Sequence, residues 1–271
     1  MMYVVLFFVI IFGAIKISSY RLRKQNLWLE GVIKERTAEI EVKNDELQLR
    51  NTEILLQKQE ITDSINYAQR IQQAILPPMA EINAMWKDGF IFFQPKDIVS
   101  GDFYWFYKIN ENEFFLACAD CTGHGVPGGF MSMVCSEKLN DGAKYFTEPA
   151  AILSHVNKQV KKALRQSEDE GSTKDGMEIA LIKMNTKTFK VSYSGANRFL
   201  WMIKRETDVL EEIKPTKWGI AGSTEDEEKY EQHELIFEKG DQLYMSSDGF
   251  ADQFGGNKGK KLMTKNFKQL M

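Results

Sequence analysis

The chain has 271 residues, 43% of them hydrophobic and 12% aromatic, so it can bury a full globular core and carry a further segment outside that core. Its net charge is only −3 and its lysines and arginines are scattered, which excludes the basic face of a nucleic-acid-binding protein; we expect no nucleic acid among its partners. Three cysteines are too few, and odd in number, for a disulfide framework, so we expect a reducing compartment for the soluble part.

The N-terminal segment has the pattern of a membrane anchor. Residues 1–15 are uncharged and almost entirely apolar, and basic residues follow at Lys16, Arg21, Arg23 and Lys24. These helical residues span only about 22 Å of a hydrocarbon core of roughly 30 Å, so the crossing must extend to Tyr20 while Lys16 snorkels. The basic flank places the C-terminal side in the cytoplasm. We therefore expect residues 1–22 to be a single-pass anchor in the cell (inner) membrane; a buried core helix is the alternative.

A long helix is expected next, over residues 23–76. Apolar residues recur there every seven positions, at Ile33, Ile40, Leu47, Ile54, Ile61, Ala68 and Ile75. This repeat predicts a coiled coil, and polar residues such as Asn44 and Asn51 in the adjoining row favour a parallel two-stranded homodimer. The alternative is a single solvated helix whose apolar row lies on another part of the same chain. Pro77 and Pro78 end the helix.

Over the remaining residues, 77–271, strand patterns and helical patterns follow one another as in a globular α+β domain. Helices are expected from near Gly128 to Leu139 and over residues 152–164, and residues 166–176 form a polar loop. Aromatic and β-branched residues predict strands at residues 90–95, 114–120, 178–185, 190–195, 199–203 and 242–249.

Three aspartates stand beside glycines where predicted strands begin or end: Asp102 in SGDF, Asp120 in ADCTGHGVPGG and Asp248 in SSDGF. Hard cations such as Mg²⁺ and Mn²⁺ prefer carboxylate, carbonyl and water oxygens, and glycine lets a backbone carbonyl approach closely. Each motif alone is equally typical of an ordinary turn. Their combination makes these aspartates candidate metal ligands.

Longer motifs place the three aspartates in a known context: DSINYAQRIQQAILPP, QPKDIVSGDFYWF, ACADCTGHGVPGGFMSM, DGMEIAL, VSYSGANRFLWMI and YMSSDGFADQFGG. In this order they resemble, over residues 63–271, the bacterial serine phosphatases of the stage II sporulation protein E and sigma-factor-regulator type, in the protein phosphatase 2C (PPM) superfamily. The resemblance implies an α-β-β-α sandwich of two antiparallel sheets, here preceded by the coiled coil and the membrane helix.

The resemblance also implies a site with two Mn²⁺ or Mg²⁺ ions. Asp120 would bridge them, the backbone carbonyl of Cys121 would bind one, Asp248 the other, and Asp102 would hold metal-bound water. Two cations lower the pKa of a shared water, so that hydroxide can attack phosphorus in line. Residues expected to shape the turn or line the neighbouring loop are Gly123, His124, Gly125 and Asn197. Lys96 is expected to be a solvated surface lysine rather than a phosphate ligand.

The expected reaction is hydrolysis of phosphoserine or phosphothreonine on a bacterial regulatory protein of the anti-anti-sigma kind. Two departures from the family pattern bear on it. Glu178 stands where the family more often has Asp, a conservative change. The chain ends at FKQLM, whereas the family closes with a strand bearing an Asp-Asp pair that completes the metal site. We therefore expect an incomplete domain with weak or no phosphatase activity in these 271 residues alone.

Two other interpretations remain open. The chain could be a non-catalytic coiled-coil dimer whose phosphatase-like domain only binds a partner. The spacing of Cys118, Cys121, His124 and Cys135 also permits a zinc site, although structural zinc sites more often use two separated ligand pairs, and a cysteine in an apolar helix is commonly core.

Overall fold

The computed structural model describes residues 1–167, 171–255 and 259–271. The chain divides into two compact units, Met1–Asp63 and Ser64–Met271. The predicted loop at 166–176 includes residues 168–170, which lie outside the described residues.

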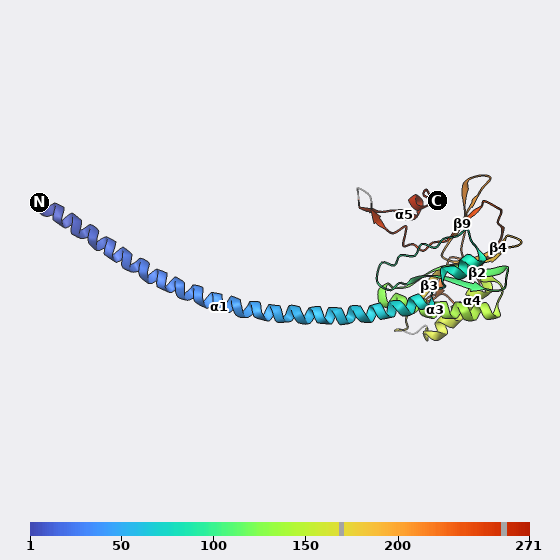
Figure 1. The fold of residues 1–271 in the computed structure, drawn as a ribbon, viewed down its shortest axis with the longest axis horizontal. Helices are drawn as coiled ribbons and strands as arrows, with labels where there is room; N and C mark the ends of the chain where they lie inside the picture. The colour runs from blue at the N-terminus through green and yellow to red at the C-terminus, as the bar shows by residue number, and fades with distance from the viewer. Residues whose placement is uncertain (168–170, 256–258) are drawn as a thin grey trace. The chain divides into compact units, whose positions relative to one another are not determined.

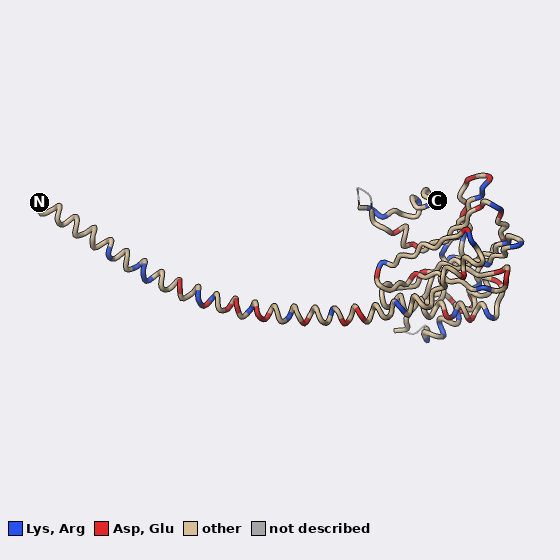
Figure 2. The backbone as a smooth tube through the Cα atoms, in the orientation of Figure 1, with Lys and Arg blue, Asp and Glu red and all other residues tan. Residues whose placement is uncertain are grey.

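The first unit is helical throughout. It belongs to α1 (Met2–Ile75), which continues into the second unit. Among the described residues one helix, at the N-terminus, is long and apolar enough to cross a membrane by length and composition, with a mean hydropathy of 2.2 over an 18-residue stretch. Figure 2 shows its first turns free of charge and the following turns carrying both signs. The membrane anchor stays a prediction.

The apolar heptad row of α1 is exposed in the single chain. Ile54 is 59% exposed, and the other large members of the row resemble it. Ion pairs between Lys43 and Glu39 and between Arg50 and Glu46, each spanning one helical turn, support the helix itself. The helix is confirmed and ends at Ile75, directly before Leu76 and the predicted stop at Pro77 and Pro78, whereas the coiled-coil pairing stays a prediction.

Two antiparallel sheets form the centre of the second unit (Figure 1). The larger has the order β1-β2-β3-β4-β8, with β7 also paired to β3, and the smaller has the order β6-β5-β9. The strands of the larger sheet are β1 (Asp102–Lys108), β2 (Glu113–Cys121), β3 (Gly176–Asn185), β4 (Lys190–Ala196), β7 (Ile220–Ala221) and β8 (Gln232–Ile236). Those of the smaller are β5 (Leu200–Lys204), β6 (Val209–Ile213) and β9 (Gln242–Tyr244).

The helices of this unit are short apart from two. These two are α3 (Gly125–Tyr145) and α4 (Pro149–Ala163). The others are α2 (Met79–Met85) and α5 (Met263–Phe267), and a two-stranded ribbon pairs β10 (Phe254–Gly255) with β11 (Lys260–Lys261). Phe267 of α5 packs edge-on against Trp201 of β5, so this helix lies on the smaller sheet.

Side chains of the larger sheet alternate between two cores, as the period of a strand requires. Odd-numbered positions of β1 and β2, such as Trp105 and Phe115, pack with Leu139 of α3 and Val156 of α4. Even-numbered positions, such as Phe106 and Phe114, pack with Leu200 of β5, and Leu243 of β9 lies against the same core. Helices therefore cover one face of the sheet and the second sheet covers the other, which confirms the predicted α+β sandwich of two antiparallel sheets.

Several predicted elements differ from the structure, and the helix expected over residues 152–164 begins at Pro149. Residues 90–95 were expected to form a strand but have no regular structure, and the first strand is instead Asp102–Lys108. The helix expected from near Gly128 begins at Gly125. The strand expected over residues 242–249 ends at Tyr244, so Asp248 lies in the loop that follows it.

Candidate active site

The strand register brings three carboxylates into one row. Asp102 of β1 pairs with Asp120 of β2, and Asp120 pairs with Glu178 of β3. Residues directly opposite each other on antiparallel strands project from the same face, with their Cβ atoms about 5 Å apart. The even-numbered positions place this row on the face that carries the second sheet. Like charges so close together repel, so ionisation of the whole row is favourable only with a cation nearby.

Asp248 reaches the row from the loop after β9. Its Oδ2 atom accepts a hydrogen bond from Nη2 of Arg198 at 3.1 Å. The preceding residue, Ser247, donates its hydroxyl to Oδ2 of Asp102 at 2.6 Å. Asp102 and Asp120 are directly opposite each other in the strand pairing. Asp102, Asp120 and Asp248, predicted from separate motifs, therefore lie together.

Arg198 lies at the centre of the cluster and comes from the connection between β4 and β5. Its Nη2 atom pairs with Asp120, with Glu178 at 2.8 Å and with Asp248 at 3.1 Å. Its side chain is only 13% exposed. The left-handed backbone of Asn197, with φ of 59°, turns the chain just before it, and Nδ2 of Asn197 donates to Glu178 at 3.2 Å.

The electrostatics of the row show a deficit of positive charge. Burial and the nearby carboxylates of Asp102 and Asp248 raise the pKa of Asp120 to about 8, although Arg198 acts in the opposite direction. One guanidinium therefore does not balance the carboxylates around it. Carboxylate oxygens are the donors that hard divalent cations prefer, so the chemistry of these side chains suits the predicted Mn²⁺ or Mg²⁺ ions.

The turn after β2 is packed against the loop that leads into β1. A Cβ atom on Gly101 would lie 2.7 Å from the carbonyl oxygen of Gly123 and 3.0 Å from that of Cys121, so no other residue fits. Gly123 has φ of 84°, in the left-handed region that favours glycine. These contacts hold the Asp102 loop and the Cys121 carbonyl side by side.

The remaining predicted site residues take different positions. Asn197 contacts the row through Glu178, and Gly125, with φ of 60°, opens helix α3. His124 does not join the row: its side chain is 84% exposed, and its Nδ1 atom bonds to Asp97 at 2.9 Å. Sequence reasoning missed Arg198 and treated Glu178 only as a substitution. Arg198 could have been noticed in the sequence as a charged residue directly before the apolar run of β5.

The zinc arrangement is not formed. Cys121 and Cys135 are buried, Cys118 is half-buried, and His124 faces solvent. Within residues 1–167, 171–255 and 259–271, no group of three or more His, Cys, Asp or Glu side chains has the arrangement of a metal centre. The carboxylates of the row close on the guanidinium of Arg198 instead.

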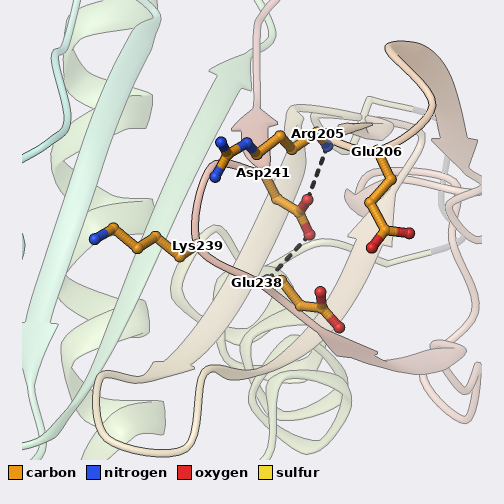
Figure 3. A pocket seen from close by; sticks show the side chains of 5 residues that line it. All are labelled: Arg205, Glu206, Glu238, Lys239 and Asp241. Atoms are coloured by element: carbon orange, nitrogen blue, oxygen red, sulfur yellow. Dashed lines mark hydrogen bonds between the residues drawn. The ribbon is translucent and has the colours of Figure 1, made fainter.

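An open pocket of about 370 Å³ lies away from the row, beside the turn between β8 and β9. Figure 3 shows Asp241 at its centre, accepting hydrogen bonds from the main-chain N–H groups of Arg205 and Glu238, both at 3.0 Å. Lys204 adds a further bond at 2.9 Å. Asp241 is thus occupied in holding the turn, and we assign this pocket no catalytic role.

Comparison with known proteins identifies the family. Residues 110–270 match the family described as Stage II sporulation protein E (SpoIIE). The chain belongs to this family. It is 24% identical over 196 residues to the phosphoserine phosphatase RsbU of Bacillus subtilis (strain 168), a match covering 72% of this chain and 55% of RsbU. The chain therefore spans about half the length of this curated relative.

Solved structures agree with this SpoIIE-family assignment. The SiaA-PP2C domain of Pseudomonas aeruginosa aligns with a TM-score of 0.69 and 27% identity, over 79% of this chain and 82% of that domain. The RsbU and RsbW domains of a Mycobacterium tuberculosis protein align with a TM-score of 0.50 and 17% identity, over 64% and 45% of the chains, a likeness of fold alone. The chain is a member of the PP2C-type serine phosphatases.

Proposed function

We propose that this chain is a metal-dependent protein serine/threonine phosphatase of bacterial signal transduction, acting on a phosphorylated regulatory protein of the anti-anti-sigma kind. The observation that carries the proposal is the carboxylate row in which Asp102, Asp120 and Glu178 are in register and Asp248 joins through Arg198. Membership of the SpoIIE family and similarity to the phosphoserine phosphatase RsbU support it.

The residues in and around the row have different roles in this proposal. Asp102, Asp120, Asp248 and the main-chain carbonyl of Cys121 would hold two Mn²⁺ or Mg²⁺ ions, which when bound supply a water activated for attack and neutralise charge on the phosphoryl oxygens. Ser247 orients Asp102 through the hydrogen bond from its hydroxyl. The tight turn at Gly123 keeps the Cys121 carbonyl against the Asp102 loop. No protein nucleophile is required in this arrangement.

We further propose how the chain is organised around this site. Residues 1–22 anchor it in the inner membrane, residues 23–76 pair two copies as a parallel coiled coil, and residues 77–271 form the phosphatase domain on the cytoplasmic side. The apolar, uncharged start of α1 and its exposed heptad row support this division.

The test is cation-dependent hydrolysis by the full chain in detergent. A phosphoserine peptide and a generic aryl phosphate serve as substrates while Mn²⁺ or Mg²⁺ is titrated. Because loss of an outer-shell partner of a metal already costs 10–100-fold, Asp120→Asn should reduce turnover by at least about 100-fold. Rates of the wild type are compared with those of this variant at each cation concentration.

The matched control is Asp208→Asn. Asp208 lies in the turn between β5 and β6 with φ of 52°, a conformation that Asn also tolerates, so this variant should keep wild-type turnover. Hydrolysis that does not depend on a divalent cation, or that survives Asp120→Asn, would contradict the proposed phosphatase.

A second candidate function is a non-catalytic dimer that binds a partner through its phosphatase-like domain. The observation that favours it is the guanidinium of Arg198 among the carboxylates, where the described residues form no group of three metal ligands. A wild-type chain that binds no Mn²⁺ and hydrolyses neither substrate, yet captures the phosphorylated regulator, would establish this function instead.

A further inference from the structure

The contacts of Arg198 differ from those of an ordinary surface ion pair. Such pairs are solvated and contribute little to stability. The Arg198 side chain is 13% exposed, and the Asp120 side chain opposite it is 18% exposed. A cation buried this deeply beside several carboxylates replaces the solvent that would otherwise screen them.

The guanidinium is held unevenly. Nη2 makes the ion pairs to Asp120, Glu178 and Asp248, whereas Nε is buried and has no hydrogen-bond partner among the described residues. Arginine frequently binds a carboxylate through two parallel N–H groups, which fixes the geometry of the pair. The position of Nη2 is therefore set by the charge of the carboxylates rather than by a directional two-point bond.

Two of the three carboxylates that Nη2 contacts are proposed ligands of the divalent cations. Asp120 and Asp248 each accept from this nitrogen through Oδ2. An oxygen atom that directly contacts a guanidinium nitrogen does not offer the same lone pair to a metal ion, and two cations at one place repel each other. The third carboxylate, Glu178, is not among the proposed ligands.

We propose that Arg198 is a resident counter-cation of the row that competes with divalent cations for Asp120 and Asp248. Occupancy by the guanidinium and loading with metal exclude each other, so Arg198 sets the concentration of free Mn²⁺ or Mg²⁺ at which the site fills. The inference rests on the proposed function, because it assigns those aspartates to a metal site. The proposal adds that a residue in the connection between β4 and β5 raises the free cation concentration needed to fill the site.

Removing the guanidinium has two opposite effects. Without added cation, the carboxylates lose their counter-ion, so the domain becomes less stable. With added cation, the competitor is gone, so metal binds more tightly and stabilises the domain more. A residue with only a packing role would lower stability in both conditions.

The experiment measures Mn²⁺ binding directly, on the full chain in detergent after treatment with a chelator. Arg198→Met keeps the length of the side chain and removes its charge, and Arg198→Lys keeps the charge on a compact ammonium. Calorimetric titration should give a Kd for Mn²⁺ that is lower by about tenfold in Arg198→Met, as expected for removal of one adjacent positive charge. The Tm of this variant should be lower without Mn²⁺ and should rise more than that of the wild type at saturation.

The control is Arg205→Met, which removes an arginine beside the Asp241 pocket and should leave Mn²⁺ affinity unchanged. Equal or weaker Mn²⁺ binding by Arg198→Met, with a wild-type chain that does bind Mn²⁺, overturns the competition and leaves the proposed function standing. Binding by Arg198→Met but not by the wild type supports the competition and counts against phosphatase activity in this chain. Absence of binding in both overturns the two proposals together.

Discussion

Close contacts between glycines hold the backbone around the carboxylate row. A Cβ atom on Gly128 would lie 2.5 Å from the carbonyl oxygen of Gly123 and 3.0 Å from the main chain of Gly101. Backbone atoms cannot rotate away as the end of a flexible side chain can. The start of α3, the turn after β2 and the loop before β1 must therefore shift together if any of them shifts.

We expect Gly128→Ala to lower the free energy of unfolding by about 1–3 kcal/mol, the usual cost of overpacking, and to weaken Mn²⁺ binding. Urea unfolding with and without Mn²⁺ measures both effects. Gly31→Ala is the control, because a Cβ atom there meets nothing within 4 Å and the helix should gain slightly. Wild-type stability in Gly128→Ala would show that the three segments are not in rigid contact.

The carboxyl group of Asp241 gives a prediction about pH. Burial acts to raise its pKa, but hydrogen bonds from the Arg205 N–H, Lys204 and the Glu238 N–H outweigh burial and lower the pKa below its ordinary value. A lowered pKa contributes stability that is complete above the unfolded-state pKa of about 4 and is lost as pH falls through the folded-state pKa.

Asp241→Asn should therefore be less stable than the wild type at pH 7, and the difference should shrink as the pH falls below about 4. Urea unfolding over this pH range measures it. Glu206→Gln, a carboxylate lost from the same pocket, is the control and should follow the wild-type profile. A constant difference between Asp241→Asn and the wild type at all pH values would mean that the ionised carboxylate is not what stabilises the turn.

Single residues of the site could be predicted where a local pattern marks them. Asp102, Asp120 and Asp248 stand in motifs punctuated by glycine, and the structure brings all three together. Glu178 joins them only through the pairing of β2 with β3, and Arg198 only through the turn that follows β4. Neither the register nor the direction of that turn is a property of neighbouring residues, so a reading of motifs did not find them.

At the scale of whole elements, one glutamine ties α1 to the site. Gln72 is buried on α1, and its Nε2 atom donates to the Ser100 carbonyl at 2.7 Å and to the Ser132 hydroxyl at 2.8 Å. Its Oε1 atom accepts from the N–H of Ser100 at 3.1 Å. Ser100 lies two residues before Asp102, and Ser132 lies on α3. The last turns of α1 are therefore bonded both to the loop that leads to Asp102 and to helix α3.

Gln72→Leu should cost about 1–3 kcal/mol in unfolding free energy, because it leaves the main-chain groups of Ser100 without their partner. It should also raise the Kd for Mn²⁺, since the Asp102 loop loses its anchor. Gln73→Leu, at the exposed neighbouring position, is the matched control. Loss of stability with unchanged Mn²⁺ affinity would show that Gln72 serves folding alone.

Strands could be predicted from the sequence where a run of apolar residues also pairs with a neighbouring strand in the structure. The run at 90–95 has the aromatic composition of a strand, but Phe90 is 80% exposed and the run ends at Pro95. It packs through single rings, such as Phe93 against Tyr104, rather than through a ladder of main-chain bonds. Helix α3 begins before the expected Gly128 because Pro127 in the first turn needs no intrahelical partner for its nitrogen.

At the scale of the whole molecule, the exposed heptad row predicts a second copy of the chain. Ile54→Cys should form a disulfide between two chains in membranes under mild oxidation, because equivalent positions of a parallel coiled coil face each other. Leu49→Cys, outside the row, should not. The native thiol of Cys118 should not form competing disulfides in this experiment. Burial is the largest cause that raises the pKa of Cys118 to about 12, so the thiol stays protonated. Equal crosslinking at both positions would contradict a specific parallel pair.

The register of the larger sheet also limits how this protein can misfold. If β2 slipped by a single residue against its neighbours, every side chain on it would turn to the opposite face. Asp120 would then enter the hydrophobic core that Leu139 and Val156 fill. Such a slipped sheet is penalised by the desolvation of one buried carboxylate. The acidic row that is proposed to bind metal would thus also disfavour a shifted register of the strands.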